Sequence, residues 1–306
     1  MSARIHKKRQ SRLLDGRLVS DFLLTRVSHE VKKLHKKKIF PKLVIILVGK
    51  NPASLSYIRQ KEKATQRTHI QYEHLNLRET IATKKLIAII EKLNRDKTVH
   101  GILVQLPLPA HIEAPLVLRA IEPAKDVDGF GAYNLGKMFL SMDFENLAPC
   151  TPRGIIRLLE YYKISPVGKR VTIIGRSNIV GKPLAVMLIN RDATVTVCHS
   201  KTKNLASHTR TADILVAAVG RPKMVKADMV KKGAIVIDVG TTKVNNRPSR
   251  SEAKQIVHLN SLVGDVDFEN VKRKASWITP VPGGVGPMTV ACLMENVVRA
   301  ARRMNM

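Results

Sequence analysis

The stretch Arg170-Val-Thr-Ile-Ile-Gly-Arg-Ser-Asn-Ile-Val-Gly181 joins an apolar run to a turn bounded by two glycines, and Lys182-Pro183 and a second apolar run follow it. The pattern predicts a buried strand over 170–174 and a helix over 182–190. A strand, a glycine turn and a helix form the phosphate site of dinucleotide-binding domains, where backbone N–H groups and the helix dipole meet the pyrophosphate. The middle glycine of the usual G-x-G-x-x-G pattern is absent, so the stretch also fits a glycine-rich turn without a cofactor.

The end of the next predicted strand, 193–198, indicates which dinucleotide would bind. An NAD-binding domain usually carries Asp or Glu there, which holds the ribose 2′-hydroxyl. This chain has Cys198-His-Ser-Lys201 and no carboxylate. Ser200 and Lys201, together with Arg176, suit a 2′-phosphate, which favours NADP.

Strand and helix patterns alternate along the chain and restart near Pro149. Before it we expect helices at 17–38, 52–66, 83–93 and 111–121, and strands at 42–49, 72–77 and 101–106. After it we expect a helix at 151–162, further strands at 214–218, 235–239 and 277–278, and a last helix that starts at Gly286-Pro287. The order predicts an α/β protein with two three-layer α/β domains, the second Rossmann-like, and a C-terminal helix that returns to the first domain. The expected boundaries are 1–13 for a basic extension, 14–148, 149–282 and 283–306.

Composition limits the class of protein. The 306 residues are 44% hydrophobic and 25% charged, as in a soluble globular enzyme. No run approaches the roughly 18 apolar residues of a membrane span, and no signal peptide opens the chain. The three cysteines are widely spaced without metal-ligand spacing, which predicts reduced thiols, no metal site and a cytoplasmic protein.

The net charge of +29 is unusual and would attract nucleic acid, acidic membranes or anionic small molecules. Only 4% of residues are aromatic, and no zinc-finger, basic-zipper or RNA-binding signature is present, so nucleic acid is not the expected partner. The basic start is too short and too irregular for the pattern of a transit segment.

Candidate catalytic side chains lie in the first half. Tyr57 and Lys61 are four apart and share one helix face, although such a pair is more often a surface lysine beside an aromatic ring. Short-chain dehydrogenases also contain a Tyr-x-x-x-Lys motif, but there the motif follows the nucleotide loop. In this chain the motif precedes the loop, so that assignment fails. Gln105 closes an apolar strand, the place where open α/β sheets contact ligands. Lys125-Asp-Val-Asp-Gly129 offers two carboxylates, or an ordinary acidic turn.

A second loop, Thr279-Pro-Val-Pro-Gly-Gly-Val-Gly-Pro-Met-Thr289, precedes the last helical pattern. Prolines stiffen the free loop, and glycines let the backbone turn sharply and approach a ligand. The loop therefore fits either a rigid structural turn or a ligand-binding segment.

These motifs together resemble, in order and spacing, the bifunctional methylenetetrahydrofolate dehydrogenase/methenyltetrahydrofolate cyclohydrolase family over about residues 14–300. The motifs that carry the resemblance are Tyr57 with Lys61, Val104-Gln-Leu-Pro-Leu-Pro109, Lys125–Gly129, Pro149-Cys-Thr-Pro152, Gly175–Gly181 and Pro280–Thr289. The resemblance implies an NADP-dependent homodimer that acts on tetrahydrofolate derivatives. By the same resemblance, Lys61 is the catalytic lysine, Gln105 is the residue that tunes Lys61, and Tyr57 forms a wall of the folate pocket. The resemblance also implies that Asp128 holds the pterin edge beside Pro282, Gly283 and Gly284. The implied dinucleotide contacts are Gly175, Arg176, Ser177, Ile179, Ser200 and Thr241.

Three features depart from the family: the high charge, the leading segment 1–12, and Arg67-Thr-His-Ile70 in place of a glycine. None lies at a catalytic position. Two alternatives stay open from the sequence. One is a monofunctional enzyme, because a single pocket would serve both reactions, and the other is a basic nucleic-acid-binding protein that reuses the fold.

Overall fold

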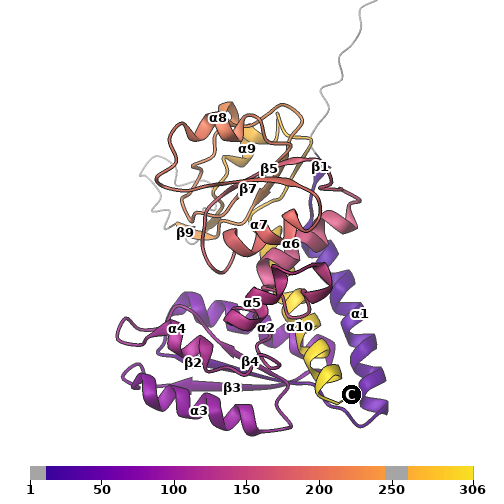
Figure 1. Ribbon diagram of the computed structural model, residues 1–306, viewed down its shortest axis with the longest axis vertical. Helices are drawn as coiled ribbons and strands as arrows, with labels where there is room; N and C mark the ends of the chain where they lie inside the picture. The colour runs from indigo at the N-terminus through magenta and orange to yellow at the C-terminus, as the bar shows by residue number, and fades with distance from the viewer. Residues whose placement is uncertain (1–11, 245–260, 306) are drawn as a thin grey trace, which may run out of the picture. The chain divides into compact units, whose positions relative to one another are not determined.

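The computed structural model describes residues 12–244 and 261–305, which form two compact units (Figure 1). Of these residues, unit 1 contains 12–16 and 158–286, and unit 2 contains 17–157 and 287–305. The last helix therefore belongs with the first half of the chain, as predicted. Residues 1–11 of the expected basic extension lie outside the described residues.

Unit 1 is built on a parallel six-stranded sheet of order β1-β11-β8-β7-β5-β6. Its strands are β1 (Arg12–Leu13), β5 (Arg170–Ile174), β6 (Thr194–Cys198), β7 (Ile214–Ala217), β8 (Ile235–Asp238) and β11 (Trp277–Ile278). The chain runs outward from β5 to β6 and then crosses back to β7, so the strand order reverses beside β5. Open α/β sheets bind ligands at the carboxyl ends of the strands at such a point.

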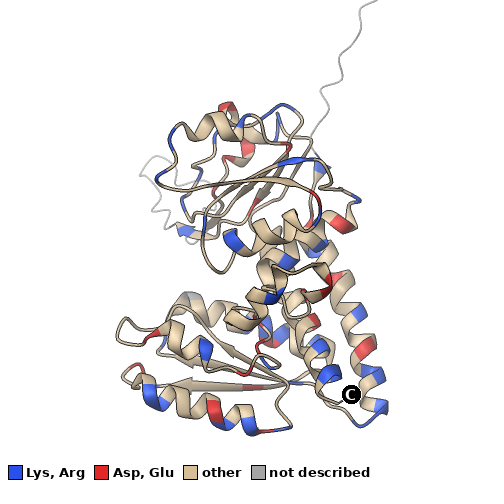
Figure 2. Cartoon of the chain, in the orientation of Figure 1, with Lys and Arg blue, Asp and Glu red and all other residues tan. Residues whose placement is uncertain are grey.

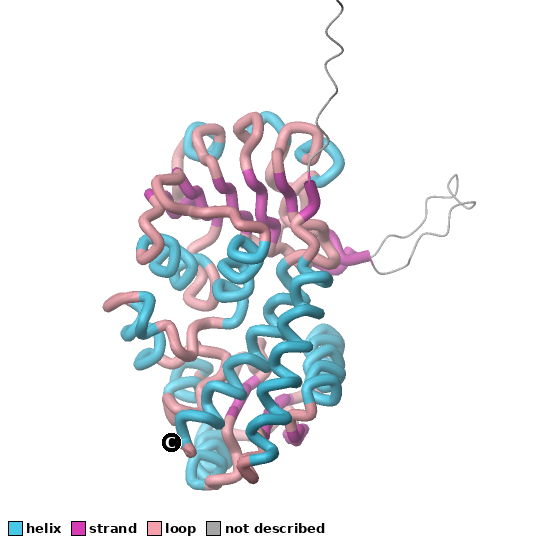
Figure 3. The backbone as a smooth tube through the Cα atoms, turned by 90° about the vertical axis from the view of Figure 1, so that its right-hand side faces the viewer, coloured by secondary structure: helices cyan, strands magenta, loops and turns pink. Residues whose placement is uncertain are grey.

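Helices cover both sides of this sheet (Figure 3), which gives the three layers of a Rossmann-like unit. The shorter elements are α7 (Gly181–Ile189), α8 (Leu205–Thr209), η2 (Ala227–Met229), α9 (Phe268–Val271) and the antiparallel pair β9 (Thr242–Val244) and β10 (Ser261–Val263). One core cluster joins Leu215, Val236 and Ile278 of the strands to Val271 of α9. Burial of this apolar area stabilises the sheet against the helices.

Unit 2 has a parallel three-stranded sheet of order β3-β2-β4. Its strands are β2 (Lys42–Val48), β3 (Gln71–Leu77) and β4 (Gly101–Val104). Val44 and Ile46 of β2 pack with α3 in one core cluster, and the alternate residues Leu43 and Ile45 are fully buried as well. The continuous apolar run of β2 thus reflects a strand covered on both faces.

Most helical residues belong to unit 2, and α1 and α10 are the longest helices (Figure 1). The helices are α1 (Gly16–Lys36), α2 (Pro52–Thr68), α3 (Thr83–Arg95), α4 (Ala114–Arg119), α5 (Ala132–Met138), η1 (Met142–Phe144), α6 (Cys150–Tyr161) and α10 (Val285–Met304).

Several details differ from the predictions. Arg12 and Leu13, expected in the extension, pair with Trp277 and Ile278 as an edge strand. The helix expected over 111–121 is confined to α4, because Ile112 forms a turn with Pro109 instead (N–O 2.9 Å). α10 starts at Val285 rather than Pro287, so the proline lies in the first turn, where a missing N–H is tolerated.

The unit boundary also falls inside α6, after Arg157, rather than before Pro149. Arg153 and Arg157 of α6 both pair with Glu295 of α10, so this part of α6 contacts the last helix within unit 2.

Lys and Arg residues occur along elements of both units (Figure 2) rather than on one element alone. All three cysteines are buried and free. In the described ranges, every helix is too short or too polar to cross a membrane.

Candidate functional site

Lys61 lies on α2, one helical turn after Tyr57. The helix starts after Asn51, whose Oδ1 accepts a hydrogen bond from Ser54 N at 3.2 Å and caps the first turn. Tyr57 is 37% exposed and Lys61 only 8% exposed. The face of α2 that carries both residues thus leads from solvent at Tyr57 to the interior at Lys61. Lys61 is therefore not a surface lysine beside an aromatic ring.

Gln105 is the hydrogen-bond partner of Lys61. It directly follows β4, and its backbone N donates to Ile46 O of β2 at 2.9 Å. Its side-chain Nε2 donates to Leu106 O at 2.8 Å, which turns Oε1 toward Lys61. Lys61 Nζ donates to that oxygen at 2.9 Å. A neutral amide can accept this bond from a charged or a neutral amine, so the contact does not fix the protonation state of the lysine.

The charge of Lys61 is set by opposing effects. Burial lowers the pKa of Lys61, while the nearby Asp128 and Cys150 act to raise it, and the net change is downward. Burial likewise raises the pKa of Asp128, and the Lys61 charge opposes that rise. A lysine with a lowered pKa can take up and release a proton closer to neutral pH than an exposed lysine can.

The two aspartates of the Lys125–Gly129 segment have different surroundings. Asp126 is buried and accepts hydrogen bonds from Gly129 N at 3.0 Å, Gly131 N at 2.8 Å and Asn134 Nδ2 at 3.0 Å. These bonds shape the loop. Lys125 Nζ donates to the carbonyls of Leu93 and Asp96 near the end of α3. Asp128 is partly exposed and is the carboxylate whose charge acts on Lys61.

The glycine turn after β5 has the backbone shape of a phosphate site. Gly175 has a φ of +124°, and a side chain there would strike Ala218 O. A side chain at Gly181, the first residue of α7, would strike Gly175 O. Ser177 Oγ accepts from Val180 N at 3.1 Å, and Arg176, Ser177 and Ile179 are exposed. Both glycines are therefore required for the close turn that leads into the helix N-terminus.

The other expected dinucleotide residues lie at the same edge of the sheet. Ser200 and Lys201 follow β6 and are exposed, in a turn where His199 N donates to Thr202 Oγ1 at 2.9 Å. Thr241 follows β8 and is exposed. Because β5, β6 and β8 belong to one parallel sheet, their carboxyl ends bring these residues to one side. A pyrophosphate and a 2′-phosphate fit these donors and cations.

The Pro280–Thr289 segment begins in unit 1. Thr279 is buried, and its Oγ1 accepts from Asp238 N at 2.7 Å. Gly283 has a φ of +115°, which favours glycine, and Pro282 is exposed. The structure assigns Pro282, Gly283 and Gly284 to unit 1, whereas Lys61, Gln105 and Asp128 belong to unit 2.

Two family models match the chain. The model described as "Tetrahydrofolate dehydrogenase/cyclohydrolase, catalytic domain" matches residues 14–128, and its "NAD(P)-binding domain" counterpart matches residues 149–305. The chain belongs to the tetrahydrofolate dehydrogenase/cyclohydrolase family.

Individual relatives of this family are similar over nearly the whole chain. The bifunctional protein FolD of Ligilactobacillus salivarius is 50% identical over 95% of this chain and 97% of its own length. The crystal structure of the bifunctional FolD enzyme of Campylobacter jejuni is 46% identical, with a TM-score of 0.87 over 96% of this chain and 99% of that one. The Trypanosoma brucei enzyme, solved with NADP and an inhibitor, is 37% identical, with a TM-score of 0.90 over 96% and 98%.

Two buried aspartates that support the nucleotide edge of this family member were missed from the sequence. Asp238 accepts from Gly240 N, Asp265 N and Val266 N, each at 2.9 Å. Asp265 accepts from the backbone N of Val219 at 2.6 Å, Gly220 at 3.1 Å and Arg221 at 2.8 Å. Burial raises the pKa of Asp238 to about 6. An Asp at the end of each apolar run, in Asp238-Val-Gly and Gly-Asp265-Val, is the signal that could have identified them.

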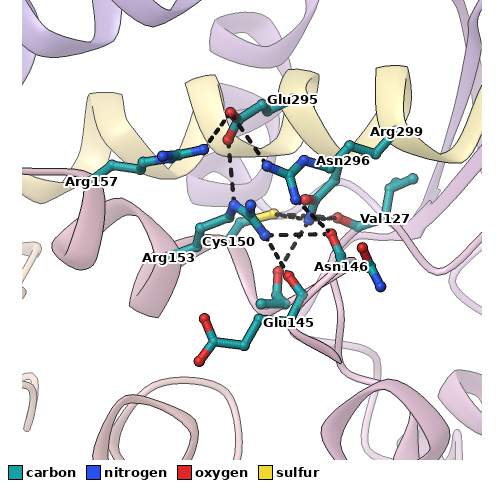
Figure 4. A network of polar contacts seen from close by, with 10 residues as sticks. Val127, Glu145, Asn146, Cys150, Arg153, Arg157, Glu295, Asn296 and Arg299 are labelled. Atoms are coloured by element: carbon teal, nitrogen blue, oxygen red, sulfur yellow. Dashed lines mark hydrogen bonds and ion pairs between the residues drawn. The ribbon is translucent and has the colours of Figure 1, made fainter. Parts of the chain in front are cut away.

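A buried ionic cluster in unit 2 was also missed (Figure 4). Glu295 of α10 pairs with Arg157 at 2.8 Å, Arg153 at 3.3 Å and Arg299 at 3.7 Å. Burial alone would raise the pKa of Glu295, but the three arginines outweigh it and lower the pKa. Arg153 also donates to Glu145 O at 2.8 Å, so the cluster ties α6 and α10 to the segment before α6.

In the parts of the chain that the structure describes, no three His, Cys, Asp or Glu side chains are grouped so that they could hold a metal ion. Of the candidate residues, Lys61, Gln105, Asp128 and Tyr57 belong to unit 2, and the glycine turn, Ser200 and Thr241 belong to unit 1.

Proposed function

We propose that this protein oxidises methylenetetrahydrofolate to methenyltetrahydrofolate with NADP and hydrolyses that product to 10-formyltetrahydrofolate, with Lys61 moving the proton. The observation that carries the proposal is the buried Lys61 amine, bonded to the neutral amide of Gln105 at 2.9 Å. Relatives that are 46–50% identical bear the name bifunctional protein FolD, which favours both activities over one. Hydrolysis of methenyltetrahydrofolate by the purified protein, faster than in buffer, is the direct test.

The hydrolysis follows from the chemistry of Lys61. Water attacks the methenyl carbon, which is cationic, and loses a proton as the ring opens to the formyl product. A neutral Lys61 amine accepts that proton and returns it to the leaving nitrogen. The second proton of the water, left on the hydroxyl of the adduct, passes to solvent as the C=O bond forms, so the hydrolysis releases one proton overall. The lowered pKa makes the neutral amine available, and Gln105 orients it without neutralising it as a carboxylate would.

NADP, when bound, accepts the hydride released from the methylene carbon of the folate. We assign its pyrophosphate to the turn at Gly175, Arg176, Ser177 and Ile179, where backbone N–H groups and a helix N-terminus meet an anion. Ser200 would bind the 2′-phosphate and Thr241 would lie near the nicotinamide.

We assign the folate to Tyr57, Asp128, Pro282, Gly283 and Gly284, with Tyr57 as a pocket wall and Asp128 on the pterin ring. The support for Asp128 is its partial exposure beside Lys61, in contrast to Asp126, which is occupied by backbone bonds.

Replacing Asp128 with Ala is expected to weaken folate binding about ten- to a hundredfold, because a charged hydrogen bond contributes about 1.5–3 kcal/mol. NADP affinity should stay within about twofold, since the glycine turn belongs to unit 1. Calorimetric titration with a folate analogue and with NADP measures both. Asp143→Ala, at an exposed aspartate of η1, is the matched control for the lost charge. Unchanged folate affinity in a folded Asp128→Ala variant would remove Asp128 from the site.

We expect catalytic efficiency with NADP to exceed that with NAD by about tenfold or more, because Ser200 and Lys201 replace the carboxylate that would hold a 2′-hydroxyl. Ser200→Asp should lower kcat/KM for NADP and affect NAD less, through repulsion of the 2′-phosphate. Ser207→Asp, at an exposed serine of α8, is the control for added charge. Equal efficiency with both dinucleotides in the unmodified protein would refute the assignment.

We further propose a cytoplasmic homodimer that supplies formyl groups for purine biosynthesis. The family resemblance and the three free cysteines support this placement. Nucleic acid is not a ligand in this proposal, because basic residues occur in both units (Figure 2) and the chain carries no nucleic-acid-binding signature. Sedimentation equilibrium tests the dimer. Filter binding of nucleic acid across a salt series tests whether nucleic acid is a ligand, since binding driven by phosphate contacts falls steeply as the salt concentration rises.

A further inference from the structure

Asn296 is a completely buried amide on α10, and its donors reach two separate segments of unit 2 (Figure 4). Its Nδ2 donates to Val127 O at 2.9 Å and to Ala148 O at 3.1 Å. The same nitrogen lies 3.6 Å from Cys150 Sγ. Cys150 in turn donates its thiol proton to Val127 O at 3.3 Å, so the two segments are joined to each other as well as to Asn296.

The two segments held by Asn296 carry the groups that act on Lys61. Val127 directly precedes Asp128, and Ala148 lies two residues before Cys150. Asp128 is the carboxylate whose charge acts on Lys61. Cys150 is a buried thiol near Lys61, and burial raises the pKa of Cys150 well above its ordinary value, which keeps the thiol protonated. The segments also touch directly, because a side chain at Gly129 would lie 2.5 Å from Leu147 O. A bond that fixes their spacing therefore fixes where Asp128 stands relative to Lys61.

The contacts of the carboxamide determine its orientation. Both N–H groups of Nδ2 are taken up by the two carbonyls, while Oδ1 has no hydrogen-bond partner in the described residues. A reversed amide would turn its oxygen toward two carbonyl oxygens and a sulfur. Asp at this position would do the same with a negative charge. Ala would remove the amide donor from both carbonyls and leave Val127 O only the weak thiol donor of Cys150.

We propose that Asn296 is a positioning residue for the cyclohydrolase reaction, by which the C-terminal helix holds Asp128 and Cys150 in register with Lys61. This inference rests on the proposed function of the Lys61 site. It explains why the last helix of the chain belongs to unit 2, since the site is incomplete without a donor from α10.

The test compares Asn296→Ala with Asn296→Ser, which keeps one hydroxyl donor, and with Asn94→Ala. Asn94 is the matched control because its Nδ2 donates to Ala120 O at 2.7 Å and its Oδ1 accepts from Glu122 N at 3.0 Å, in the same unit. KM and kcat for methenyltetrahydrofolate hydrolysis and their pH profile are measured in each. Folding is followed by thermal melting.

Asn296→Ala is expected to raise KM and lower kcat, each by about tenfold, from loss of a hydrogen bond that sets geometry. Its pH–rate limb should move to lower pH by about half a unit, because a more distant Asp128 raises the pKa of Lys61 less. Asn296→Ser should recover part of each change. Asn94→Ala should lower the melting temperature only.

Wild-type KM and pH profile in a folded Asn296→Ala variant would overturn the inference, as would the same kinetic changes in Asn94→Ala. If Asn296→Ala does not fold, Asn296→Ser decides, and wild-type kinetics there would overturn the inference. An inactive unmodified protein would instead refute the proposed function, and this inference with it.

Discussion

Lys61→Met is expected to lower the rate of methenyltetrahydrofolate hydrolysis by about two to four orders of magnitude, the usual contribution of a positioned acid or base. Methionine keeps most of the length of the buried chain, one atom shorter than lysine, but cannot bond to Gln105 Oε1 or move a proton. NADP binding should be unchanged, because Lys61 and the glycine turn belong to different units. Hydrolysis is measured with methenyltetrahydrofolate alone, and NADP affinity by calorimetry.

Lys63→Met provides the matched control. Lys63 lies on the same helix but is exposed, so this variant loses the same charge without touching the site. We expect it to hydrolyse methenyltetrahydrofolate at nearly the wild-type rate. Hydrolysis at the wild-type rate by a folded Lys61→Met protein would contradict the role given to Lys61.

Glu295→Gln is expected to lower the free energy of unfolding by about 3–5 kcal/mol, because removing one partner of a buried ion pair leaves the other charges uncompensated. Glutamine has the shape of glutamate, so the loss reports charge rather than a cavity. Three arginines face this carboxylate, and only 17% of its side chain is exposed. Denaturant unfolding of both proteins at neutral pH measures the difference.

The pH dependence of this effect has a defined sign. The arginines lower the folded-state pKa of Glu295 below its ordinary value of 4.5. Its stabilisation is therefore fully present above that value and is lost as the pH falls through the lower, folded-state pKa. The difference between wild type and Glu295→Gln should shrink only in that acidic range.

Glu269→Ala serves as the comparison, because Glu269 forms an exposed pair with Lys272, which is expected to contribute at most about 1 kcal/mol. A Glu295→Gln protein no less stable than Glu269→Ala would show that the cluster is not a stabilising element of unit 2.

The hydrophobic pattern and the local spacing of residues were sufficient to predict much of the fold. The apolar run of β2 predicted a strand covered on both faces, and the run before Gly175 predicted β5 and its turn. Strand β1 could not be found, because two residues carry no periodic pattern and pair with Trp277 only through the tertiary fold. In α1, Leu18 and Phe22 are exposed although both are apolar, because the buried side of that helix carries Val19 and Leu23.

For the site, the four-residue spacing placed Tyr57 and Lys61 on one face, but only the resemblance joined Lys61 to Gln105, 44 positions away. Asn296 was missed because its partners lie far along the chain. Glu295 has a local partner in Arg299, but its pairs with Arg153 and Arg157 also join residues that lie far apart in the sequence. Cys150 was noted as a reduced thiol, and its contact with Val127 O is purely tertiary.

The most direct test of two activities in one chain is a time course with purified protein, methylenetetrahydrofolate and NADP, in which NADPH, methenyltetrahydrofolate and 10-formyltetrahydrofolate are followed together. We predict that NADPH and the formyl product accumulate in nearly equal amounts, while the methenyl intermediate stays low. NADPH formation with a matching build-up of methenyltetrahydrofolate, which then decays only at its rate in buffer, would contradict the account.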